Sequence, residues 1–240
     1  MMASGGMVEP GSRDAEKRAA ALAAIEEVRD GMIVGLGTGS TAAFAIEALA
    51  RRYREGLLNI RTTATSLKTA GLARQHGLPV LSFEDLTAID LCIDGVDEID
   101  EQMRAVKGAG GAMLREKIVA QAATRMVAIC DSAKQVKTLG TKPLPIEVLP
   151  FARAWILDKI IGLGVTPSLR SGDDAKPFLT DQGNVVIDCH LEGRIAHGDF
   201  AEALEGLPGM LGHGLFSTEI DALYVGIGER VECVQRIHTP

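Results

Sequence analysis

The sequence lacks features that several classes of protein require. Its four cysteines form no CxxC pair and have no histidine at the spacing of a metal ligand, which argues against a zinc site and predicts reduced cysteines in the core. The five histidines share no metal or triad spacing, and no serine lies in a GxSxG elbow. Zinc enzymes and serine hydrolases of that type are therefore excluded.

Excess positive charge and long apolar runs are also missing. The formal net charge of −7 argues against a nucleic-acid partner, because binding to a phosphate backbone is driven by clustered lysine and arginine. A small phosphorylated metabolite remains compatible, since a few backbone amides and one or two lysines can hold a phosphate. Residues 1–14 contain no continuous apolar segment, so we expect neither a signal peptide nor a membrane anchor. We expect residues 1–13 to form a disordered tail of a cytoplasmic protein.

The hydrophobic pattern of the first part of the chain alternates between helices and short β-rich runs. Expected helices cover residues 14–28, 42–53, 69–76 and 112–124, and expected strands cover residues 32–34, 61–64, 78–81, 89–93 and 126–130. This alternation predicts an α/β fold with a Rossmann-like, mostly parallel sheet covered by helices.

The pattern changes around three prolines at positions 143, 145 and 150. From there on, the sequence predicts a strand at 146–149, a helix at 152–163, strands at 167–170 and 185–189, a helix at 199–204 and a strand at 210–216. This βαββαβ order is typical of a smaller ferredoxin-like α+β domain. We expect the last strands, 222–227 and 231–237, to return to the first domain. The predicted domains are therefore 14–142 plus 217–238, and 143–216.

A glycine-rich turn at residues 35–41 lies between an expected strand and an expected helix. It combines three alternating glycines with the hydroxyls of Thr38, Ser40 and Thr41. Unpaired amides and the helix dipole attract anions at such a position, so a phosphate fits there. The turn lacks the third glycine of GxGxxG and the lysine of a P-loop, which weakens a nucleotide interpretation. A plain turn with Ser40 or Thr41 as the helix cap is the alternative.

Carboxylates cluster at residues 94–100, directly after an apolar strand. Ligands of open α/β sheets bind beyond that end of a strand, and crowded carboxylates can divide acid and base roles between them. The alternative is a turn whose acids are solvated. A divalent-metal site is disfavoured, because no histidine is nearby.

Residues 107–111, KGAGG, open a further helix, and their amides can point together at a developing oxyanion. On a helical wheel, the expected core face of this helix consists of Leu114, Ile118, Val119 and Ala122. Glu116 lies roughly 140° from that face, which predicts that it is not packed inside and leaves a solvated glutamate as the alternative. Lys134 comes after the strand at 126–130, where it could hold an anion or lie free on the surface.

Several ordered motifs resemble the ribose-5-phosphate isomerase A family. They are GTGST at 37–41, DGVDEID at 94–100, KGAGGAMLREK at 107–117, DSAKQV at 131–136 and LPIEVLPFA at 144–152, followed by TDQGNVVIDCH at 180–190 and PGMLGHGLF at 208–216. The resemblance covers about residues 14–235 and depends on the order and spacing of the whole set.

The resemblance implies a set of substrate-contacting residues. They are Thr38, Gly39, Ser40, Thr41, Asp94, Gly95, Val96, Asp97, Lys107, Gly108, Ala109, Gly110, Lys134 and, by a looser match, Lys17. Glu116 matches the general base. Lys134 and Lys17 match phosphate-binding lysines. Two departures stand out: Ala109 replaces a glycine of the family's KGGG loop, and residues 62–66 only partly match its serine-rich loop.

The implied reaction interconverts D-ribose 5-phosphate and D-ribulose 5-phosphate through a cis-enediolate, as in the non-oxidative pentose phosphate pathway. Ring opening falls to Asp94, proton transfer to Glu116, oxyanion stabilisation to Lys107 with the loop amides, and orientation of Lys107 or a sugar hydroxyl to Asp97. We expect no metal and no redox cofactor. The resemblance also implies a homodimer or homotetramer.

Related folds leave other functions open. A sugar-phosphate sensor would keep the phosphate loop and could lose the base, an acyl-CoA transferase would use a nucleophilic glutamate, and a dinucleotide-dependent dehydrogenase is the weakest alternative. The presence of Asp94, Asp97, Lys107 and Glu116 together favours the isomerase.

Overall fold

The computed structural model describes residues 12–172, 176–191 and 199–237. Most of the tail expected at 1–13 lies outside the described residues, but Ser12 and Arg13 belong to the first helix. The Ser12 hydroxyl accepts a hydrogen bond from the amide of Ala15 at 3.2 Å, which caps that helix.

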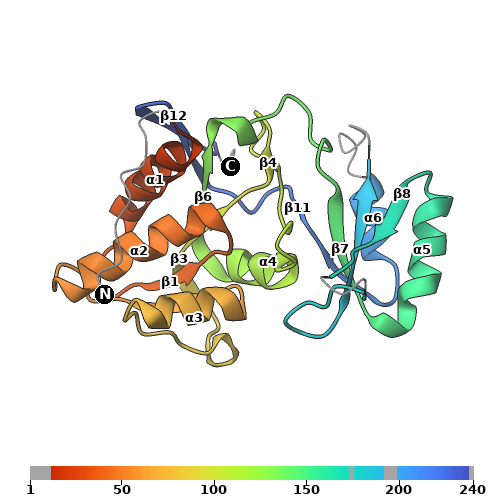
Figure 1. Ribbon diagram of the computed structural model, residues 1–240, viewed down its shortest axis with the longest axis horizontal. Helices are drawn as coiled ribbons and strands as arrows, with labels where there is room; N and C mark the ends of the chain where they lie inside the picture. Colours follow the sequence, from red (N-terminus) through yellow and green to blue (C-terminus); the bar gives the residue numbers. More distant parts are fainter. Residues whose placement is uncertain (1–11, 173–175, 192–198, 238–240) are drawn as a thin grey trace.

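A six-stranded sheet forms the larger part of the molecule (Figure 1). In spatial order its strands are β13 (Arg230–Gln235), β12 (Ala222–Ile227), β6 (Ala123–Asp131), β3 (Ile89–Gly95), β1 (Ile33–Leu36) and β2 (Arg61–Ala64). All neighbouring pairs are parallel except β12 with β13. The predicted Rossmann-like, mostly parallel sheet is thus confirmed, and the last two strands do join it.

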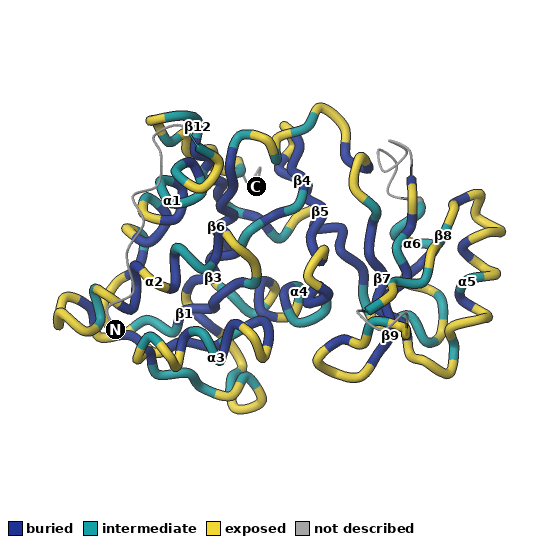
Figure 2. The backbone as a smooth tube through the Cα atoms, in the orientation of Figure 1, coloured by how far each residue is buried: buried dark blue, intermediate teal, exposed yellow. Residues whose placement is uncertain are grey.

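Helices cover both faces of this sheet. They are α1 (Arg13–Ala24), α2 (Ser40–Arg54) and α3 (Leu67–Gln75) on one face and α4 (Met113–Ala122) on the other. Side chains of β6 alternate between the two cores, since Val127 and Ile129 pack in the first and Met126 and Ala128 in the second. Burial on both faces is what the near-continuous apolar strands predict, and Figure 2 shows these strands as buried.

A four-stranded antiparallel sheet comes next in the chain. Its spatial order is β10 (Met210–His213), β7 (Leu144–Val148), β9 (Val185–His190) and β8 (Thr166–Leu169), with helices α5 (Arg153–Gly162) and α6 (Asp199–Glu205). Counted along this part of the chain, the order is fourth, first, third, second. The βαββαβ succession and this order together confirm the ferredoxin-like unit.

A third, three-stranded sheet was not expected from the sequence. It consists of β11 (Leu215–Phe216), β5 (Ala105–Val106) and β4 (Glu98–Ile99). The strand expected at 210–216 therefore divides between two sheets, with a break at Gly214. A Cβ on Gly214 would lie 2.0 Å from the Lys107 carbonyl oxygen, so the close approach of the two segments requires glycine there.

Two further expectations need correction. Residues 78–81 form only an isolated bridge between Thr62 and Val80, because Pro79 has no amide to continue a ladder at this edge. Cys233, on the edge strand β13, is exposed, so the prediction of a core position holds only for Cys92, Cys130 and Cys189; all four thiols are free.

We propose the division into domains 14–142 plus 217–238 and 143–216 because the six-stranded sheet has a core on each face and the four-stranded sheet has a separate one. Residue 238 lies outside the described part of the chain. Within that part, no helix is long and apolar enough to cross a bilayer.

Candidate active site

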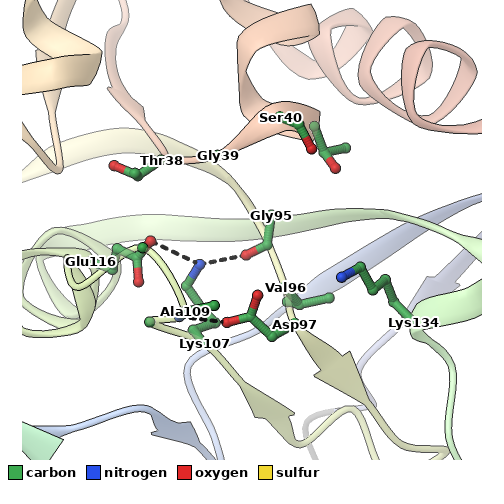
Figure 3. Close-up of a pocket in the computed structure, with 13 residues that line it drawn as sticks. Thr38, Gly39, Ser40, Gly95, Val96, Asp97, Lys107, Ala109, Glu116 and Lys134 are labelled. Atoms are coloured by element: carbon green, nitrogen blue, oxygen red, sulfur yellow. Dashed lines mark hydrogen bonds and ion pairs between the residues drawn. The ribbon is translucent and has the colours of Figure 1, made fainter. Parts of the chain in front are cut away.

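A cavity of about 190 Å³ lies beyond the carboxyl ends of β1, β3 and β6 (Figure 3). It is lined by Thr38, Gly39, Ser40, Thr41, Gly95, Val96, Asp97, Lys107, Gly108, Ala109, Gly110, Glu116 and Lys134. Every one of these residues belongs to the set expected from the sequence. Two members of that set, Asp94 and Lys17, do not line this cavity.

The first wall of the cavity is the turn between β1 and α2. Gly39 is the N-cap of α2 with φ of 120°, a left-handed conformation that favours glycine, and it makes no side-chain capping bond. The alternative in which Ser40 or Thr41 caps the helix is therefore wrong, since α2 begins at Ser40. No side chain in the described part of the protein caps the first-turn amides of α2 at the cavity, which leaves them available to an anion.

A cluster of hydroxyls holds this turn from behind. The Thr38 hydroxyl lies 2.8 Å from the Thr65 hydroxyl, 2.9 Å from that of Ser66 and 3.1 Å from that of Thr69. Thr69 also donates to the Gly37 carbonyl at 3.0 Å. Thr65, Ser66 and Thr69 were not among the expected site residues. The hydroxyl-rich segment at 62–66 could have pointed to Thr65 and Ser66.

Asp94 lies behind the cavity and is fully buried. Its Oδ1 accepts from the amides of Thr38 at 3.0 Å and Gly95 at 2.7 Å, and its Oδ2 lies 2.9 Å from Lys107 Nζ. Burial raises the pKa of Asp94, an effect opposed by Lys107 and by the two amides. Asp94 thus ties the turn between β1 and α2 to Lys107 and is not among the residues that line the cavity.

Lys107 comes directly after β5 and is one of the most deeply buried large side chains. Its Nζ contacts Asp94, lies 3.5 Å from Glu116 Oε1 and donates to the Gly95 carbonyl. Burial by itself lowers the pKa of Lys107, but the charges of Asp94 and Glu116 outweigh it and raise the pKa, so the ammonium group stays charged.

Glu116 projects from the first turn of α4 toward Lys107 (Figure 3). Its side chain is only 4% exposed, and its Oε2 has no hydrogen-bond partner among the described residues. Burial raises the pKa of Glu116 to about 8; Lys107 opposes this increase, and Asp94 adds to it. A carboxyl group with such a pKa can take up and release a proton near neutral pH.

The helical wheel placed the core face of α4 wrongly. The buried residues of this helix are Met113, Glu116, Val119 and Ala120, whereas Ile118 is 43% exposed. The reason is that α4 packs between two bodies: Val119 meets the six-stranded sheet, and Leu114 contacts Gly212 of β10. Leu114 therefore marks a second apolar contact, and Glu116 lies on the sheet side.

The loop after Lys107 is shaped by its glycines. Gly108 and Gly111 have φ values of 98° and 77°, whereas Ala109 is not in the left-handed region. The replacement of glycine by Ala109 therefore requires no strained backbone. Asp97 accepts a hydrogen bond from the Ala109 amide at 2.9 Å, so it holds this loop.

Lys134 lines the cavity at the side away from Glu116 (Figure 3). A second cavity of about 290 Å³ adjoins the first, shares Ser40, Asp97 and Lys134 with it, and is also lined by Lys17 and Arg13. Lys17 forms an ion pair with Asp14 at 3.0 Å. One end of the site thus contains Lys134 beside acidic and basic side chains of the second cavity, and the other end carries the Lys107 and Glu116 pair.

Among the described residues, no group of three or more histidine, cysteine, aspartate or glutamate side chains could hold a metal ion. At the cavity, Lys107 and the backbone amides of the loop at 108–110 are groups that could stabilise a developing oxyanion.

Comparisons with known proteins identify the family of this chain. Residues 61–230 match the family described as "Ribose 5-phosphate isomerase A (phosphoriboisomerase A)". Ribose-5-phosphate isomerase A of Sphingopyxis alaskensis is 47% identical over 222 residues, which are 92% of this chain and 96% of that protein.

Solved structures give the same result for the fold. Ribose 5-phosphate isomerase A from Methanocaldococcus jannaschii superposes with a TM-score of 0.89 at 33% identity, over 93% of this chain and 100% of that one. A D-ribose-5-phosphate isomerase in complex with phospho-erythronic acid gives 0.88 at 34% identity, over 92% and 97%. The chain therefore belongs to the ribose 5-phosphate isomerase A family.

Proposed function

We propose that this chain interconverts D-ribose 5-phosphate and D-ribulose 5-phosphate through a cis-enediolate, with Glu116 as the base that moves the proton between C2 and C1. One observation carries this assignment. Glu116 Oε2 is buried, has no hydrogen-bond partner in the described part of the chain, and belongs to a carboxyl group at the cavity beside a charged lysine.

The two ends of the cavity give the substrate its direction. A phosphate group fits at the N-terminus of α2, where Ser40 and Thr41 supply hydroxyls and Lys134 supplies a charge. Lys17, in the adjoining cavity, adds positive potential at the same end. The sugar carbons then extend toward Lys107 and Glu116.

The chemistry needs one proton transfer at carbon and one at oxygen. Glu116 takes the C2 proton of the open-chain aldose and returns it to C1, while the hydroxyl proton passes from O2 to O1. The enediolate carries negative charge on these oxygens between the two steps. Lys107, which is buried, and the loop amides stabilise that charge.

Ring opening must precede this step, and the position of Asp94 changes the role that we propose for it. Asp94 could promote ring opening only by acting through Lys107, because the Asp94 carboxylate is fully buried behind this lysine. Asp97 is the aspartate that lines the cavity, so we propose that Asp97 contacts the sugar hydroxyl and that Asp94 sets the position and charge of Lys107.

The direct test is a coupled assay of ribose 5-phosphate conversion combined with exchange of deuterium from C2 into solvent. We expect both turnover and partial washout. Binding of ribose 5-phosphate without turnover would support the sensor alternative, and a covalent acyl-glutamate formed from an acyl-CoA donor would support the transferase.

We further propose that the protein is cytoplasmic, needs neither a metal nor a redox cofactor, binds no nucleic acid and assembles as a homodimer or homotetramer. Family membership supports the assembly. Turnover should survive exhaustive chelation, and sedimentation at the mass of one chain would contradict the oligomer.

A further inference from the structure

Arg170, from the four-stranded unit, contacts the loop that closes the active-site cavity. It comes directly after β8, and its Nη1 donates to the carbonyl oxygens of Gly108 and Ala109, both at 3.0 Å. Its Nε donates to Asp188 Oδ2 at 2.8 Å, and its Nη2 donates to Asp188 Oδ1. The guanidinium group is thus fixed by Asp188 on one side and holds two successive loop carbonyls on the other.

This pair is well shielded and geometrically constrained. The side chains of Arg170 and Asp188 are 16% and 15% exposed, and their contact is bidentate, which is the strongest arrangement for such a pair. Asp188 lies on β9, whose ladder with β8 fixes its position relative to Arg170. Phe178, which donates its amide to the Arg170 carbonyl, packs where a Cβ on Gly111 would have to be.

Holding the carbonyls determines where the amides point. In a planar trans peptide the C=O and the following N–H are directed oppositely. The carbonyl of Gly108 is held by Arg170, and the next amide, that of Ala109, donates to Asp97. The carbonyl of Ala109 is held in the same way, which directs the Gly110 amide away from Arg170.

The Gly110 amide has no acceptor within the described part of the chain, and Gly110 lines the cavity. A free amide whose direction is set in advance is what stabilises an oxyanion without reorganisation at the moment of reaction.

We propose that Arg170 is a positioning residue of the isomerase: anchored by Asp188, it orients the loop at 108–110 so that the Gly110 amide donates to the enediolate oxygens. This inference rests on the proposed function. It also explains why a segment outside the cavity carries a half-buried ion pair that contacts the loop.

The test compares Arg170→Met and Arg170→Lys with Arg153→Met, a matched change of an exposed arginine on α5 in the same unit. Loss of a whole oxyanion donor costs roughly 10²- to 10³-fold in kcat, so a misdirected donor in Arg170→Met should cost roughly 10- to 100-fold. KM should stay within about twofold, because the phosphate is held elsewhere. Arg170→Lys should recover part of kcat, and Arg153→Met should match the wild type.

Two inhibitors distinguish a loss of loop orientation from a general distortion of the active site. If the proposal holds, the carboxylate of phospho-erythronic acid takes the place of the enediolate oxygens at the loop, so Arg170→Met should weaken inhibition by this compound by a factor similar to the loss in kcat/KM. Inorganic phosphate should inhibit the variant and the wild type equally. Equal losses for both inhibitors, or an unchanged kcat in folded Arg170→Met, would overturn the proposal. If Arg170→Met does not fold, Arg170→Lys and Asp188→Asn carry the same comparison.

A failure of the proposed function would be visible separately, since the wild-type protein would then not turn over ribose 5-phosphate at all.

Discussion

The six-stranded sheet and the four-stranded unit make different contributions to the same site. The residues that line the cavity come from residues 38–134, whereas no described residue of the four-stranded unit lines it. That unit instead contacts the site from outside, through Arg170 on the loop carbonyls and through Pro145, which packs close to Gly108. In the function that we propose, one body supplies the reacting groups, and the other fixes their positions.

The difference arises from how the strands run. Parallel strands place all their carboxyl ends at one edge, so the loops after β1, β3 and β6 converge there. In the antiparallel unit successive strand ends alternate between two edges, so such a unit does not gather chain ends at one place. It offers a rigid face instead, and a residue at the end of one strand can then support a loop of the neighbouring body.

The largest effect is expected inside the cavity, for Glu116→Gln. The amide keeps the size of the side chain but cannot accept the carbon-bound proton, so kcat should fall by roughly 10² to 10⁴. Deuterium washout from C2 should stop, while inhibition by phosphate persists. Glu101→Gln, at an exposed position, is the control. A variant that keeps most of its turnover would show that another group is the base.

Lys107→Met should both inactivate and destabilise the protein. It leaves the buried carboxylates of Asp94 and Glu116 without their cation, and loss of one partner of a buried pair costs roughly 3–5 kcal/mol. Adding Asp94→Asn should recover part of the unfolding free energy without recovering activity. Urea unfolding of the single and double variants measures this coupling. Additive losses would mean that the two residues do not depend on each other.

The pH dependence is set by the raised pKa of Glu116, about 8. A base must be deprotonated, so kcat/KM should rise with pH and level off above about pH 8. The free energy of unfolding should fall as the pH rises, because the folded state holds this proton more tightly than the unfolded chain, where the pKa of a glutamate is 4.5. The contribution is present below the unfolded pKa and is lost as the pH rises through about 8. The unfolding free energy of the wild type minus that of Glu116→Gln should therefore fall as the pH rises from 4.5 to about 8.

A smaller effect is expected at the phosphate end. Lys134→Ala should raise KM roughly tenfold and change kcat little, since a charge-assisted contact made equally in ground state and transition state contributes uniform binding. Lys137→Ala, at an exposed position outside the cavity, should have no effect. If Lys134→Ala leaves both kinetic parameters unchanged, the phosphate lies elsewhere.

The smallest effect is expected for Ala109→Gly, which restores the glycine of the family motif. Because Ala109 has no left-handed backbone, activity should stay within about twofold and stability should fall by roughly 0.5–1 kcal/mol. Gly108→Ala is the contrasting change in the same loop. Its Cβ would lie 2.6 Å from Met113 Cβ at a φ of 98°, so activity should drop sharply. Equal effects of the two substitutions in assays and thermal unfolding would contradict this description of the loop.

The larger sheet and the residues around the cavity could be predicted because their signals are local. Apolar runs that end in glycine turns mark parallel strands, and the motifs lie directly after them. The burial of Glu116 could not be predicted, because a helical wheel assumes one core and α4 has contacts on two sides. The three-stranded sheet was missed because two-residue strands have no periodicity.

Arg170 was missed for a different reason. Its partners Gly108 and Ala109 lie 62 and 61 positions away in the sequence, and an arginine after a strand is ordinary by local criteria. The position of Asp94 behind the cavity also needed the fold, since a carboxylate at a strand end looks the same from the sequence whether it faces a ligand or a lysine.

The strand order has a consequence for how the molecule is made. In the large sheet, β6 lies between β3 and β12. Strand β12 comes from residues 222–227 and is synthesised after the whole four-stranded unit. Until then β6 presents a long apolar edge of unpaired backbone, of the kind that templates association between chains. Truncation before β12 should therefore yield aggregation-prone protein, because the central strand β6 would lack a partner on one side.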